Sequence, residues 1–235
     1  MKKIKTGMSV KVIPIQAGLG QVFLVKQGDH AFLVDAGNKG YEKKILKTLS
    51  THKVDPKSLL FIFITHAHYD HAGSAAALKK ATGAPVITHE KEAHFLKQGF
   101  QPLPKGTAPF YKTLISLGKK MGKIFSGFPP LTADITFKQD YDLKTLFDID
   151  GKILHTPGHT MGSSVLIIDQ FVFAGDTLFN LWNGTVYPLF ADNEALLKES
   201  WRMLLNLEQK YFYPAHGKRL DHRAFHREAI KKHII

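Results

Sequence analysis

The stretch Thr65-His66-Ala67-His68-Tyr69-Asp70-His71-Ala72-Gly73 carries three histidines and one aspartate within six positions. It directly follows the apolar run Leu59-Leu60-Phe61-Ile62-Phe63-Ile64. That run is short and rich in Phe and Ile, as is typical of a fully buried strand. Imidazole nitrogens and a carboxylate cannot be packed into a core without partners. We therefore predict a metal site at the carboxyl end of a strand over 59–64.

The spacing inside this stretch predicts how its ligands are shared. His66 and His68 are two positions apart, so on an extended segment they point to the same side and can hold one ion. Asp70 and His71 then turn toward a second ion. Imidazole and carboxylate suit Zn(II), Fe(II) or Mn(II) better than Cu(I). Any single one of the 13 histidines would be an ordinary surface or core residue, whereas this dense run favours metal binding.

Length and composition predict one globular domain over residues 1–235. A chain of this length with 44% hydrophobic residues can bury a substantial core. The basic start at Met1–Lys5 lacks the apolar region of a secretory signal, and no apolar run approaches the length of a membrane span. Without cysteine there are no disulfides, so we expect a cytoplasmic protein with no transmembrane segment.

Apolar runs and turn residues predict an alternation of strands and helices. Strands are expected at 10–14, 21–25, 30–34, 59–64, 84–88, 135–137, 152–155, 164–168, 171–174 and 211–214. Helices are expected at 41–51, 74–82 and 191–207, the last with Asp192 as its N-cap. Such alternation is typical of a layered α/β fold. Asp35 ends the third strand, where it either caps a turn or supports the metal loop.

Residues 94–134 differ in character from the rest of the chain. No acidic residue lies between Glu92 and Asp134, although several lysines do. Apolar side chains recur there at helical intervals, at Phe110, Leu114, Leu117, Met121 and Ile124. We interpret 94–134 as an inserted segment with a basic amphipathic helix. It is a covering helix with solvated lysines, a lid for an anionic or amphiphilic small-molecule substrate, or a membrane-surface helix.

Three further candidate ligands, His159, Asp176 and His216, each lie just past an apolar strand in a glycine-bearing turn. Strand ends gathered on one edge of a layered fold converge. We predict that His66, His68 and His159 hold one ion, that Asp70, His71 and His216 hold the other, and that Asp176 bridges both. Each ion then keeps an open position, as in catalytic sites. The remaining histidines, including His89, His94, His155, His222, His226 and His233, are expected to be peripheral or solvated.

From Asp35 to His216 the chain resembles the metallo-β-lactamase superfamily through its His-x-His-x-Asp-His motif. The resemblance implies an α/β fold of four layers, an αββα sandwich, with a dinuclear site on one edge of two packed sheets. It also implies a metal-bound hydroxide as the nucleophile. The segments 158–162 and 175–179 are similar to those of the glyoxalase II group.

Two positions narrow the expected substrate. The commonest zinc β-lactamases have cysteine where this chain has Asp176, so hydrolysis of antibiotics is not expected. Small lactonases of the superfamily carry a tyrosine where this chain has Phe179. The first position argues against β-lactam substrates and the second against lactones, but neither identifies the acyl group of the substrate.

These observations favour a hydrolase that uses two divalent ions, zinc first and iron or manganese next, to cleave an ester, thioester or lactone. Asp70 and Asp176 are the expected catalytic residues, which orient the hydroxide and receive its proton. A phosphodiesterase or nuclease is a second possibility, favoured by the net charge of +12. A one-iron thiol or persulfide oxygenase would use only the first three histidines. A non-catalytic scaffold stabilised by metal is the fourth possibility.

Overall fold

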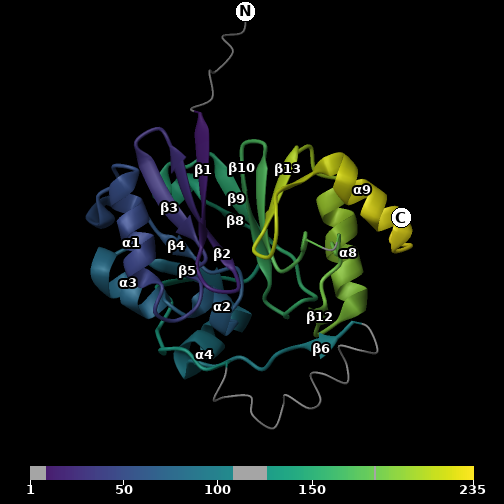
Figure 1. Ribbon diagram of the computed structural model, residues 1–235, viewed down its shortest axis with the longest axis horizontal. Helices are drawn as coiled ribbons and strands as arrows, with labels where there is room; N and C mark the ends of the chain where they lie inside the picture. The colour runs from purple at the N-terminus through teal and green to yellow at the C-terminus, as the bar shows by residue number, and fades with distance from the viewer. Residues whose placement is uncertain (1–8, 108–125, 183) are drawn as a thin grey trace, which may run out of the picture.

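The computed structural model describes residues 9–107, 126–182 and 184–235. Two six-stranded sheets pack face to face, and helices cover the outer face of each (Figure 1). This arrangement confirms the predicted α/β fold with four αββα layers.

The first sheet begins as an antiparallel meander and continues as parallel strands. Its order is β1 (Val10–Gln16), β2 (Gln21–Gln27), β3 (His30–Val34), β4 (Ile62–Phe63), β5 (Val86–His89) and β7 (Ile135–Phe137). β4 is shorter than the predicted strand over 59–64. Backbone hydrogen bonds from Leu60 to Ala31 and from Ile64 to Ile87 nevertheless continue the extended pairing on both sides of it.

The second sheet contains the strands of the second half of the chain. Its order is β14 (Leu220–Asp221), β13 (Tyr211–Pro214), β11 (Phe171–Gly175), β10 (Ser164–Ile168), β9 (Gly151–His155) and β8 (Tyr141–Asp142). All neighbours are antiparallel except β11 and β13, which run parallel. β9, β11 and β13 therefore end on the same edge of the sheet.

Alternation along the strands builds separate cores on the two faces of each sheet. Phe23, Phe63 and Phe173 point between the sheets, where they belong to one buried cluster. Their neighbours Leu24 and Ile62 point to the opposite face, against the helices. Because successive side chains of a strand point to opposite faces, a continuous apolar run can fill both cores.

Two groups of helices cover the sandwich (Figure 1). α1 (Glu42–Thr51), α3 (Ala75–Thr82) and α4 (Glu90–Gln98) lie over the first sheet, and α8 (Glu194–Leu205) and α9 (His222–Lys231) lie over the second. The shorter helices are η1 (Pro56–Ser58), α2 (Tyr69–Ala72) and α7 (Lys144–Phe147). Among the described residues, no helix is both long enough and apolar enough to cross a membrane.

Two predictions about the helices were wrong. α8 begins at Glu194 rather than at residue 191, and its N-cap is Asn193, whose side chain accepts hydrogen bonds from the backbone of Ala195 and Leu196. Asp192 lies one residue too early for this role. Of the histidines predicted to be solvated near the C-terminus, His226 and His233 are exposed, whereas His222 is partly buried and its Nε2 lies 3.0 Å from the carbonyl of Leu205.

The predicted insertion over 94–134 is described at both ends. Residues 94–98 complete α4, and β6 (Lys105–Gly106) pairs with β12 (Phe190–Ala191). The five apolar residues of the predicted amphipathic helix, 110 to 124, lie outside the described residues. The assignment of a single domain with 94–134 as an inserted lid-like segment therefore stays a prediction.

Candidate metal centre

The predicted ligands all follow strands that end on one edge of the sandwich. His66 and His68 come directly after β4, and α2 then presents Asp70 and His71. The other three ligands follow strands of the second sheet: β9 precedes His159, β11 precedes Asp176 and β13 precedes His216. The structure brings all seven side chains together in two adjoining groups.

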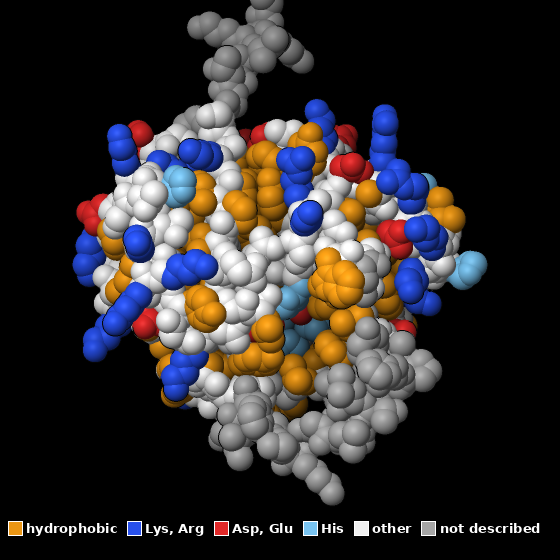
Figure 2. Space-filling view, viewed as in Figure 1, with side chains coloured by type: hydrophobic (Ala, Val, Ile, Leu, Met, Phe, Trp, Pro, Cys, Tyr) orange, Lys and Arg blue, Asp and Glu red, His pale blue; other side chains and the backbone are white. Residues whose placement is uncertain are grey.

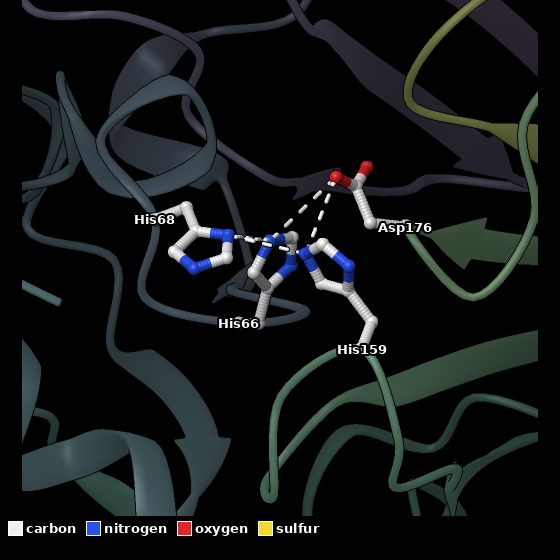
Figure 3. A group of neighbouring side chains, drawn as sticks. All are labelled: His66, His68, His159 and Asp176. Atoms are coloured by element: carbon white, nitrogen blue, oxygen red, sulfur yellow. Dashed lines mark hydrogen bonds and ion pairs between the residues drawn. The ribbon is translucent and has the colours of Figure 1, made fainter. Parts of the chain in front are cut away.

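The first group contains His66, His68, His159 and Asp176, all of them buried (Figure 3). Nδ1 of His68 lies 2.9 Å from Nε2 of His66 and 3.1 Å from Nε2 of His159. Oδ2 of Asp176 lies 3.4 Å from Nε2 of His159 and 4.0 Å from Nε2 of His66. Ligand atoms around a tetrahedral zinc lie roughly 3.3 Å apart. The donor atoms of this group therefore fit one such ion.

The second group contains Asp70, His71 and His216. Nε2 of His216 lies 3.3 Å from Oδ2 of Asp70, and Nε2 of His71 lies 4.0 Å from Oδ1 of Asp70. Oδ1 of Asp176 completes this group, at 3.2 Å from Nε2 of His71 and 3.3 Å from Nε2 of His216. Asp176 thus presents one oxygen to each group, which is the arrangement of a bridging carboxylate.

Hydrogen bonds behind the imidazole rings determine which nitrogen faces the centre. Nδ1 of His71 lies 2.9 Å from Oδ2 of Asp35. Nδ1 of His159 lies 2.9 Å from the carbonyl oxygen of Phe190, and Nδ1 of His216 lies 3.2 Å from the carbonyl oxygen of Leu19. A ring that donates from Nδ1–H keeps a lone pair on Nε2. These three rings therefore turn a metal-binding nitrogen toward the centre.

Three buried atoms of the ligand side chains have no satisfactory hydrogen bond in the described part of the chain: Nε2 of His68, Nε2 of His71 and Oδ1 of Asp176. The last two face each other inside the centre at 3.2 Å but lack hydrogen-bond geometry. Buried polar atoms normally have partners, and an unpaired one is costly. A cation between the two groups would satisfy both atoms, so the residues present fit a metal ion.

Burial keeps the histidines of the first group neutral. It lowers the pKa of His66 well below its usual value and lowers the pKa of His68 to about 3. Burial also lowers the pKa of His159. Neutral imidazole is the form that binds a metal, so this group can accept a cation without releasing protons.

Carboxylates have the opposite effect in the second group. Burial acts to lower the pKa of His216, but the carboxylates of Asp176 and Asp70 outweigh it and raise that pKa to about 10. The pKa of His71 is likewise raised well above its usual value against burial, chiefly by Asp176 and Asp35. These two histidines must release protons when a cation binds.

Asp35 and Glu92 support the centre without belonging to the predicted ligand set. Asp35 accepts hydrogen bonds from the backbone and hydroxyl of Thr65, so the structure favours its supporting role over simple turn capping. Glu92 is completely buried on α4 and was not singled out from the sequence. The sequence does contain a signal for its burial: Glu92 precedes Leu96 by four residues, so the two side chains lie on the same, buried face of the helix. His89 and His155 lie outside both groups and stack on each other.

Comparison with known proteins identifies relatives over most of the chain. A family model described as the metallo-beta-lactamase superfamily matches residues 15–216. A hydroxyacylglutathione hydrolase of Haemophilus influenzae, GloC, is 28% identical over 207 residues, which cover 85% of this chain and 86% of the relative. A probable metallo-hydrolase of Streptococcus pyogenes is 30% identical over 211 residues, which cover 88% of this chain and 82% of the relative.

Solved structures with a similar fold include a metallo-enzyme and a di-iron protein. The crystal structure of the B3 metallo-beta-lactamase BLEG-1 has a TM-score of 0.70 at 23% identity and covers 92% of this chain and 95% of its own. TTHA1623 in a di-iron-bound form has a TM-score of 0.66 at 25% identity, with 92% and 98% covered. The first shows the same fold, and the second shows a similar chain with two metal ions.

Proposed function

This chain belongs to the metallo-β-lactamase superfamily and is a metal-dependent hydrolase, and we propose that it cleaves an ester, thioester or lactone at a dinuclear site. The observation that carries this proposal is the position of Asp176, which turns Oδ2 toward one group of histidines and Oδ1 toward the other. One ion would need only the ligands of the first group, so the second group, Asp70, His71 and His216, supports a second ion.

The donor atoms favour zinc as the first metal to test. Imidazole nitrogens and carboxylate oxygens suit Zn(II) and also Fe(II) and Mn(II). The di-iron form of TTHA1623 makes iron the second metal to test. Two such cations held by these residues would lower the pKa of a bound water toward ~7 and would polarise the oxygen of a carbonyl group.

The two carboxylates of the centre have different tasks in this proposal. Asp176 has an oxygen in each group, so it orients the reacting water and holds the two halves of the centre together. Asp70 contacts His216 closely through Oδ2, while its Oδ1 has only a 4.0 Å contact with His71. We therefore propose Oδ1 of Asp70 as the atom that receives the proton.

The protonation of Asp70 is consistent with that role. Burial acts to raise the pKa of this carboxyl, but His71 and His216 outweigh burial and lower the pKa. Asp70 is therefore ionised at neutral pH in the metal-free protein, which is the form of a carboxyl group that can accept a proton. Thioesters and lactones have good leaving groups, so they need little further acid assistance.

Apolar side chains at the opening favour an acyl substrate. Leu19 is 62% exposed, although it is a large hydrophobic residue. Leu19 contacts His216 through its carbonyl, and the ring of Phe179 lies 5.0 Å from that of His216. In Figure 2, histidine and carboxylate side chains are visible inside an opening bordered mainly by hydrophobic side chains. Such a border fits the acyl part of an amphiphilic substrate.

A thioester is the first substrate to test, because the relative GloC is named for a hydroxyacylglutathione, which is a thioester. A phosphodiester is the second candidate because the net charge of +12 favours anionic substrates. Lactones complete the panel. Measuring hydrolysis of all three classes by the same purified protein separates these candidates.

The substitution His68→Ala tests the whole proposal. We expect it to remove most of the bound metal and nearly all hydrolysis, because His68 Nδ1 contacts both other histidines of the first group. His94→Ala is the matched control, since His94 lies outside both groups. Metal content and hydrolysis are measured on both variants. Retention of metal and hydrolysis by His68→Ala would refute the site.

A further inference from the structure

Glu92 is a completely buried carboxylate in the first turn of α4. A carboxylate in such a position is costly unless donors surround both of its oxygens. Besides the nearby side chain of Gln101, its donors come from two segments that are distant in the sequence. The role of the buried carboxylate therefore depends on which functional residues these two segments contain.

The carboxylate of Glu92 joins the two loops that carry the histidines of the first group. Oε2 accepts a hydrogen bond of 2.9 Å from the backbone N–H of Ala67, which stands between His66 and His68. Oε1 accepts hydrogen bonds of 2.9 Å from the hydroxyl of Thr160 and the backbone N–H of Gly162. These two residues closely follow His159.

We propose that Glu92 is a positioning residue for His66, His68 and His159, the histidines that hold one ion. It orients these three ligands because its carboxylate binds both of the loops that carry them. The inference rests on the proposed metal centre. Among the described residues, none of the second-group ligands Asp70, His71 and His216 donates a hydrogen bond to Glu92. A loss of Glu92 should therefore affect one ion selectively, which a residue needed only for folding would not do.

The requirement is for two acceptor oxygens, not merely for a polar side chain of this size. In Glu92→Gln, the side chain keeps its shape but has one oxygen and one NH₂ group. The NH₂ group then faces either the N–H of Ala67 or the N–H of Gly162, and a donor facing a donor is repelled. One of the two loops loses its hold in either orientation.

Gly162 shows how closely the second loop approaches this carboxylate. A Cβ atom at this position would lie 2.5 Å from Oε1 and 2.7 Å from Cγ of Glu92. Any side chain there must displace Glu92. Gly162→Ala is therefore a second variant, which disturbs the carboxylate without removing it.

The experiment measures metal binding rather than turnover. Metal-free protein is titrated with Co(II), followed by its absorption spectrum, and with Zn(II), followed by calorimetry. The two ions are separated by working in two backgrounds, His216→Ala, which keeps the first group intact, and His68→Ala, which breaks it. Glu90→Gln is the matched control, because Glu90 is an exposed glutamate on the same helix.

In the His216→Ala background, Glu92→Gln should weaken binding of the remaining ion by about 10- to 100-fold and change its Co(II) spectrum, as loss of a group behind metal ligands does. The His68→Ala protein is expected to lose most of its metal on purification, but its second group of ligands can still take up added ions, and the same substitution should leave the affinity for that second ion unchanged. Glu90→Gln should change neither. Equal weakening in both backgrounds, or no change in either, would overturn the proposal.

Thr160→Val and Gly162→Ala keep the test open if Glu92→Gln does not fold. Thr160→Val removes one hydroxyl donor to Oε1 at nearly constant volume, so a smaller but equally selective loss of affinity is expected. Selectivity for the first ion is again the deciding result, and its absence in both variants counts against Glu92. If the unmodified protein binds no metal, the proposed function fails. If it binds two ions that Glu92→Gln does not distinguish, only this inference fails.

Discussion

Oδ2 of Asp35 lies 2.9 Å from Nδ1 of His71, and both side chains are buried. The same carboxylate accepts from the hydroxyl of Thr65, whose oxygen lies 3.1 Å from Nδ1 of His66. Asp35 therefore supports one histidine in each group of ligands. Its backbone has a φ of 62°, a left-handed conformation that Asp and Asn tolerate better than most residues.

Asp35→Asn tests this shared support. The amide fits the same backbone conformation, but it has only one acceptor oxygen for His71 and Thr65. We expect metal affinity to fall by about 10- to 100-fold, and hydrolysis to fall with it. Metal titration of purified protein provides the measurement. Asp169→Asn is the control, since Asp169 is exposed and has a similar φ of 52°. Unchanged affinity in Asp35→Asn would show that His66 and His71 do not depend on Asp35.

Asp176→Asn tests the bridge between the two groups. An amide offers one oxygen, so only one of the two ions can keep an oxygen ligand from this position. We expect the variant to hold one ion tightly and to bind the other more than about 100-fold more weakly. This loss of affinity is larger than the loss caused by removing a residue that only supports a ligand. Metal analysis after dialysis against a chelator measures this loss. Two tightly held ions in the variant would contradict the bridging role.

Asn193→Ala tests where α8 begins. The side chain of Asn193 satisfies two backbone N–H groups of the first turn, and losing such a cap costs about 0.5–2 kcal/mol. Urea unfolding of the protein measures the change. Asp192→Ala is the comparison, because the sequence predicts Asp192 as the cap and the structure does not. A larger loss of stability in Asp192→Ala would favour the prediction from sequence.

Asp134→Asn tests an ion pair at the end of the 94–134 segment. Oδ1 of Asp134 accepts from Nζ of Lys79 at 2.8 Å, and Oδ2 accepts from the backbone of Val86. Burial acts to raise the pKa of Asp134, but these two hydrogen bonds outweigh it and lower the pKa below 3.8. The partly exposed pair contributes about 1 kcal/mol or less.

The sign of the pH dependence follows from that lowered pKa. The stability that Asp134 contributes is fully present above its pKa in the unfolded chain and is lost as the pH falls through its lower pKa in the folded protein. The difference in unfolding free energy between the unmodified protein and Asp134→Asn should therefore be constant near neutral pH and shrink in acid, once the pH falls below the usual pKa of an aspartate. Unfolding curves over this range measure it. A difference that grows in acid would contradict the pairing.

Local patterns determined much of this protein from the sequence alone. Strands such as β2 and β10 could be predicted because a continuous apolar run bounded by turn residues has few competing structures. The dense run from His66 to His71 indicated metal chemistry for a similar reason, since so many polar nitrogens cannot be buried without partners. Helix boundaries were less well predicted, because neighbouring residues such as Asp192 and Asn193 have almost the same capping propensity.

Tertiary structure decided how these residues work together. His159 and His68 are 91 positions apart, yet their ring nitrogens lie 3.1 Å from each other. No periodicity in the sequence shows which nitrogen of a ring faces the centre, that Asp176 divides its oxygens between two groups, or that Glu92 joins two loops. Each of these features depends on hydrogen bonds between distant segments, which exist only once both sheets have packed and brought their strand ends to one edge.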